Sequence, residues 1–128
     1  MEGIDSDKDG IRDDLQRYIA LTFPNSAKTR AALGQFSKEA QTLLINSGDN
    51  TAVNVHTRES LRAIGCLGFI VGSEPAATIY HQLRALLLNT QLRSVAWIKS
   101  VANFSGQVVE GPLDLKTGCN FDPDLMEN

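Results

Sequence analysis

The sequence lacks the features that mark membrane-spanning, redox and nucleic-acid-binding proteins. None of its apolar runs approaches the roughly 20 residues that a membrane-spanning helix needs, and the longest, residues 63–72, is broken by glycines. Only two cysteines are present, and they do not form a Cys-x-x-Cys pair. The formal net charge is −3, which gives no general attraction to nucleic acid or to an anionic membrane surface. We therefore expect neither a membrane span nor a nucleic-acid partner.

A secretory signal is also missing from the N-terminus, which is acidic and has no apolar segment. The chain starts almost directly on a cluster of aspartates, as the mature form of an exported protein would. Met1 would then be a cloning residue.

The two cysteines, Cys66 and Cys119, are compatible with one disulfide, although two unrelated thiols are the alternative. Cys119 lies in a polar tail that contains glycine and proline, where a free thiol has little packing purpose. In the chain-entropy description, closing a loop of about 50 residues stabilises a protein by roughly 4 kcal/mol. The pattern therefore favours a disulfide, and with it an oxidising location, periplasmic or secreted.

Apolar residues recur at helical spacing over most of the chain. The predicted helices run from Leu15 to Phe23, from about Ala27 to Ile45, from Thr51 or Thr57 to Val71, and from about Ala76 to Phe104. The last of these either continues through Asn89-Thr90 or breaks there. Asn25 or Ser26, and later Ser73, are the expected helix caps.

These elements predict an all-α fold, a bundle of four or five helices. The length of 128 residues suits a single domain with one core. We expect a metal loop over residues 1–14, the bundle over 15–105 and an irregular tail over 106–128, stapled by the disulfide. Residues 107–110 could add a short strand within that tail.

Aspartates at alternate positions precede the first helix, at Asp5, Asp7 and Asp9, followed by Gly10 and Asp13. Calcium prefers about six to eight oxygen ligands, and alternate carboxylates let one short loop surround a single ion. A glycine after the third carboxylate permits the sharp turn that such a loop needs. A cluster of this kind repels itself unless a cation lies inside it, so the sequence predicts a calcium site. A solvated acidic terminus is the alternative, and magnesium is the lesser metal candidate.

The stretch resembles the Asp-x-Asp-x-Asp-Gly-x-x-Asp calcium repeats of the thrombospondin type 3 and dockerin families, and the loop of EF-hands. The resemblance covers about a dozen residues. It implies that Asp5, Asp7 and Asp9 bind calcium through their side chains, Ile11 through its carbonyl, and Asp13 directly or through water. The twelfth position, a bidentate Glu in EF-hands, is Gln16 here, so Asp13 or Asp14 would replace it or the affinity would fall. The apolar Ile11 side chain is free to pack inward.

A rival interpretation is a small enzyme or a ligand carrier, with a groove near His56, Tyr80 and His81. No His-Glu-x-x-His spacing supports zinc or acid–base chemistry there. A further candidate is a face for a protein partner formed by Trp97, Ile98, Val101 and Phe104, although residues at this spacing are more often core. The preferred interpretation is a non-enzymatic, exported, calcium-stabilised helical domain with a structural or binding role.

Overall fold

Helices account for most of the chain that the computed structural model describes, namely residues 3–104 and 114–126. The elements are α1 Asp13–Thr22, α2 Ala27–Ile45, α3 Asn50–Val71, α4 Ser73–Leu87, α5 Gln91–Phe104 and the short 3-10 helices η1 Leu115–Gly118 and η2 Pro123–Leu125. The described residues contain no β-strand, which confirms the all-α prediction. The strand considered for residues 107–110 lies outside them.

The helix boundaries follow from local chemistry. Ser26 caps α2 by accepting the Thr29 N–H (3.2 Å), as expected. Asp49 caps α3 through the N–H groups of Thr51 (2.9 Å) and Ala52 (3.2 Å). Ser73 does not cap α4, because Gly72 holds the N-cap position at φ 92°, a backbone conformation that suits glycine.

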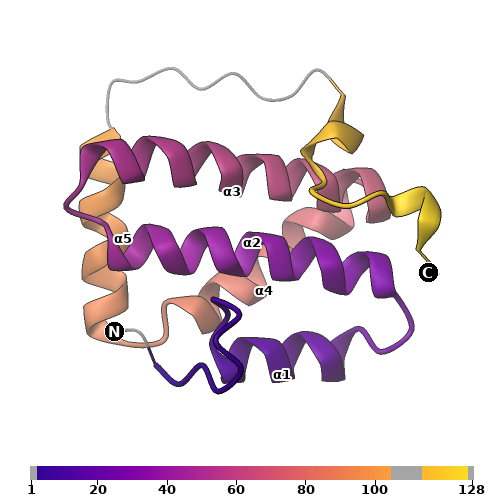
Figure 1. Cartoon of the computed structure of the whole chain (residues 1–128), viewed down its shortest axis with the longest axis horizontal. Coiled ribbons are helices and arrows are strands. Elements are labelled where there is room, and N and C mark those ends of the chain that lie inside the picture. Colours follow the sequence, from indigo (N-terminus) through magenta and orange to yellow (C-terminus); the bar gives the residue numbers. More distant parts are fainter. Residues whose placement is uncertain (1–2, 105–113, 127–128) are drawn as a thin grey trace.

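The central helix is α2, and its neighbours pack around it (Figure 1). The antiparallel pair of α2 and α3 forms one side of the bundle, α1 lies along α2, α4 passes behind, and α5 runs across one end. The main cluster of buried apolar side chains draws on all five helices, from Leu15 of α1 to Ala96 of α5. The chain does break at Asn89-Thr90, so α4 and α5 are separate helices.

The tail is fastened to the bundle by covalent and polar contacts. Cys66 of α3 and Cys119 form the predicted disulfide. Gln35 of α2 donates to the Gly118 carbonyl (2.7 Å) and accepts the Asn120 N–H (3.0 Å). A Cβ at Gly118 would collide with the carbonyl oxygen of Arg62, so glycine permits the close approach to α3.

None of the described helices combines the length and the apolar character that crossing a membrane requires.

Candidate metal centre

The acidic loop, residues 4–13, is closed by its own backbone. The Asp13 N–H donates to the Ile4 carbonyl (2.8 Å), which joins the start of the loop to the start of α1. Gly10 adopts φ 88°, the left-handed turn for which the sequence predicted glycine. Its N–H donates to Asp5 Oδ2 (2.9 Å), so the turn folds back over the first aspartate.

Three of the predicted ligands converge. One carboxylate oxygen from each of Asp5, Asp7 and Asp13 lies within 4.8 Å of the other two. Calcium–oxygen distances are roughly 2.3–2.6 Å, so oxygens around one ion are separated by at most about 5 Å. Of the two Asp5 oxygens, Oδ2 accepts the Gly10 N–H, whereas Oδ1 is buried and has no hydrogen-bond partner. An anionic oxygen shielded from water without a donor is costly unless a cation compensates it.

Asp9 and Gln16 lie beside this group. Gln16 Nε2 donates to Asp9 Oδ2 (2.9 Å) and to Asp7 Oδ2 (3.2 Å), so the twelfth-position amide already bridges two carboxylates. Asp9 Oδ1 accepts the Ile11 N–H (2.9 Å). Desolvation raises the pKa of Asp9, and the neighbouring negative charge of Asp7 acts in the same direction. Self-repulsion within the cluster is therefore present at Asp9.

Asp13 is held in place by Ser6, a residue whose role the sequence did not predict. Its two oxygens accept the Ser6 N–H (2.9 Å) and the Ser6 hydroxyl (2.5 Å). The hydroxyl bond is the largest cause of the lowered pKa of Asp13. Ser6 thus keeps the ninth-position carboxylate charged and directed into the loop.

Asp14 pairs with Arg12 and is not part of the group formed by Asp5, Asp7 and Asp13. Both of its oxygens pair with the Arg12 guanidinium, at 2.9 Å from Nε and 3.0 Å from Nη2. Arg12 is 1% exposed and also donates to the carbonyls of Leu86 and Leu87 (3.0 Å each), at the end of α4. Gln16, at the twelfth position of the loop, therefore lies beside the other carboxylates, and the Asp14 carboxylate does not take its place there.

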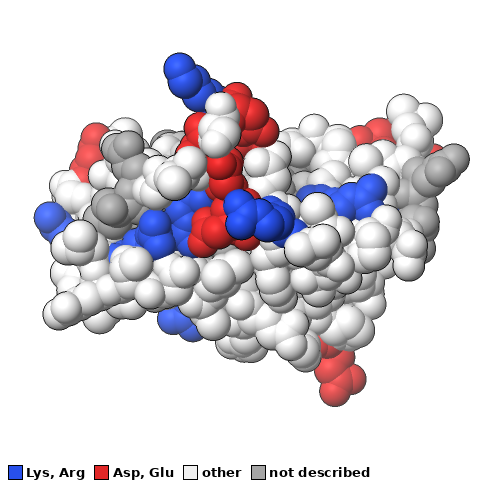
Figure 2. Space-filling model, turned by 90° about the horizontal axis from the view of Figure 1, so that it is seen from below, with Lys and Arg blue, Asp and Glu red and all other residues white. Residues whose placement is uncertain are grey.

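The loop also packs on α2. Ile11 is half-buried against the core, and its Cδ1 would lie 3.6 Å from a Cβ at Gly34, as expected of an inward-facing apolar side chain. Figure 2 shows the acidic side chains of this face gathered together, with Lys and Arg side chains beside them. The cluster is thus fixed to the bundle by one apolar and one charged contact.

The histidines do not form a shared site. His56 Nδ1 lies 2.6 Å from Glu39 Oε2 on α2, whereas Oε2 of Glu59, three residues further along α3, lies 3.7 Å from Arg62 Nε. His81 is exposed, and its ring centroid is 5.3 Å from that of Tyr80. Among the described residues, the aspartates at 5, 7 and 13 are the only grouping of three potential metal ligands.

The residues around Trp97 divide between core and surface. Trp97 packs against the core and lies 5.3 Å from the Arg84 guanidinium carbon. Ile98 and Val101 are 67% and 55% exposed, so the expectation that they belong to the core is wrong. The Phe104 side chain lies outside the part of the chain that is described.

Comparison of the chain with protein-family models, with curated proteins and with solved structures finds no match in any of the three. Function must therefore be argued from the site itself.

Proposed function

We propose that this chain is a calcium-stabilised helical domain that works outside the cytoplasm in a structural or binding role. Calcium would fasten the acidic loop to the bundle. The observation that carries the proposal is the convergence of Asp5, Asp7 and Asp13 within 4.8 Å, with a buried Asp5 oxygen that no donor satisfies. Asp9, the Ile11 carbonyl and Gln16 would complete the ligand set.

Calcium suits this ligand set better than magnesium. The loop offers several carboxylates from one short segment, which matches calcium's need for many oxygens and tolerance of irregular geometry. Magnesium keeps most of its waters and uses one or two carboxylates. Gln16 would offer only a neutral oxygen where EF-hands have a carboxylate, and its amide would have to turn, since its nitrogen now faces Asp7 and Asp9. This predicts modest affinity and suits a calcium-rich exterior.

The disulfide supports the same location. Disulfides persist in oxidising compartments and are rare in the cytosol, and Cys66 and Cys119 are bonded. In a binding role, a protein partner would meet the apolar side chains that α5 leaves exposed, among them Ile98 and Val101.

The test is the melting temperature in saturating calcium and in excess chelator. A ligand at 100 times its Kd stabilises the folded state by about 2.7 kcal/mol, which raises Tm by about 8 °C for a chain of this size. Asp7→Ala should abolish the shift, because it removes an exposed ligand while Asp5 keeps its bond to Gly10.

Glu74→Ala is the matched control, since it removes an exposed carboxylate from the first turn of α4. This variant should respond to calcium like the unmodified chain. Identical melting curves with calcium and with chelator would end the proposal. An equal rise in Tm with magnesium would show that the loop does not select calcium over magnesium.

A further inference from the structure

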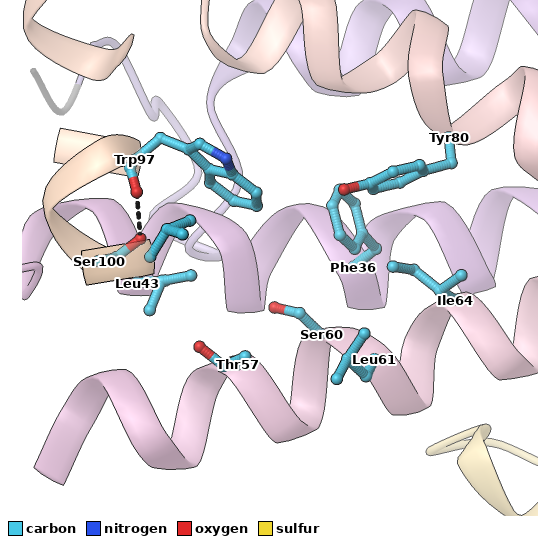
Figure 3. A pocket seen from close by; sticks show the side chains of 10 residues that line it. Phe36, Leu43, Thr57, Ser60, Leu61, Ile64, Tyr80, Trp97 and Ser100 are labelled. Carbon is cyan, nitrogen blue, oxygen red and sulfur yellow. Dashed lines mark hydrogen bonds between the residues drawn. The ribbon is translucent and has the colours of Figure 1, made fainter. Parts of the chain in front are cut away.

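A cavity lies on the side of α2 that faces α3, α4 and α5. Its volume is about 170 Å³, and its walls are mostly apolar, formed by residues such as Leu43, Ile64 and Trp97. Figure 3 shows these side chains directed toward a common space between the helices. Leu61 and Val101, 40% and 55% exposed, line it where it meets the surface. The cavity therefore has both an enclosed interior and a route of entry.

One buried polar group in the wall has no partner. Ser60 is 6% exposed, and its Oγ forms no hydrogen bond. In Figure 3 this hydroxyl points into the cavity. The other serine of the lining, Ser100, is satisfied by donating to the Trp97 carbonyl (2.7 Å). A buried hydroxyl without a partner is unusual and calls for an explanation, such as a ligand that the site is built to receive.

Aromatic rings form much of the remaining wall. Phe36 and Tyr80 meet edge to face, with ring centroids 5.4 Å apart, and Trp97 contributes a third ring. The Arg84 guanidinium over Trp97 fixes the orientation of the indole. Aromatic side chains at such spacing favour an aromatic guest over an alkyl chain of equal size.

We propose that this cavity binds a small uncharged aromatic molecule that carries one hydroxyl group, a ligand of the phenol class. The ring would lie among Phe36, Tyr80 and Trp97, and the hydroxyl would pair with Ser60 Oγ. A protein cavity of about 150 Å³ accommodates benzene, so the volume suits a single substituted ring. The lining contains no charged side chain, which disfavours an ion. This inference does not depend on the calcium proposal, since none of its residues belongs to the acidic loop.

The experiment titrates the protein with phenol and with toluene, which has nearly the same shape but no hydroxyl. Trp97 is the only tryptophan, so its fluorescence reports on the cavity, and amide NMR shifts locate the bound ligand. Both compounds should bind saturably. Ser60→Ala should lower the affinity for phenol about tenfold, the ratio expected for one lost hydrogen bond. The affinity for toluene should stay unchanged.

Ser37→Ala is the matched control. Ser37 is also buried, with an unpartnered Oγ, but it does not line the cavity. This variant should bind phenol like the unmodified chain, and Ser60→Leu, which fills the space, should bind neither compound. Absence of saturable binding, or the same loss of phenol affinity in the Ser37 and Ser60 alanine variants, would overturn the proposal.

Discussion

At the scale of single residues, Arg12 joins the acidic loop to the far end of α4. Its guanidinium neutralises Asp14 and satisfies the carbonyls of Leu86 and Leu87, which the end of a helix leaves without intrahelical donors. A cation is also favoured there by the helix dipole. One side chain thus connects the acidic loop, α1 and α4.

Arg12→Ala should lower the free energy of unfolding by about 3 kcal/mol, because removing the buried guanidinium leaves the carbonyls of Leu86 and Leu87 without their donor. The measurement is urea denaturation in the presence of chelator, so that metal binding does not contribute. Arg17→Ala is the control, since Arg17 is an exposed arginine of the same helix, and its effect should stay within about 0.5 kcal/mol. Equal effects of the two variants would contradict the role given to Arg12.

The convergence of Asp5, Asp7 and Asp13 was predictable because the carboxylate spacing and the glycine are local features of the sequence. The role of Arg12 was not, because its carbonyl partners lie more than 70 residues along the chain. The same limit applies to Ser60, whose hydroxyl is notable only once the helices around it are placed. The sequence identified the side chains that can bind a metal or form hydrogen bonds, but only the fold determines which of them come into contact.

At the scale of elements, periodicity predicted the helices better than the faces they bury. In α3, Leu61 lies at helical spacing from Ile64 yet is 40% exposed, and the buried residues include Ser60, Ala63 and Cys66. Small residues lie inward there because α2 packs against them. In α2, Gln35, Ser37 and Gln41 are buried beside the apolar residues, since a central helix has neighbours on more than one side. Spacing alone cannot indicate a central position.

The disulfide acts between elements, since it ties the tail to α3 across a separation of 53 residues. Reduction should lower the free energy of unfolding by about 4 kcal/mol, the loop-closure value for this length. The measurement is denaturation with and without reductant. The double variant Cys66→Ser/Cys119→Ser should be insensitive to reductant, and an unchanged stability of the reduced chain would show that Gln35 and its contacts hold the tail alone.

At the scale of the whole molecule, both end segments are held by contacts to the middle of the chain. The acidic loop reaches α2 through Ile11 and α4 through Arg12. The tail reaches α3 through Cys119 and α2 through Asn120. Neither segment has a core of its own, so each depends on a cross-link: a disulfide at one end and, in our proposal, a calcium ion at the other.

The pH dependence of folding should report the N-terminal attachment. Desolvation acts to raise the pKa of Asp14, but the Arg12 guanidinium outweighs it, so the pKa lies below the ordinary value of 3.8. A carboxyl with a lowered folded-state pKa stabilises the protein above its unfolded pKa, and this stability is lost as pH falls through the folded value. In chelator, Tm should therefore decline below about pH 4.

Asp14→Asn should start from a lower Tm at neutral pH and decline less on acidification, whereas Glu74→Gln should follow the unmodified chain. Parallel declines for all three proteins would show that the pair between Arg12 and Asp14 does not couple the loop to global stability.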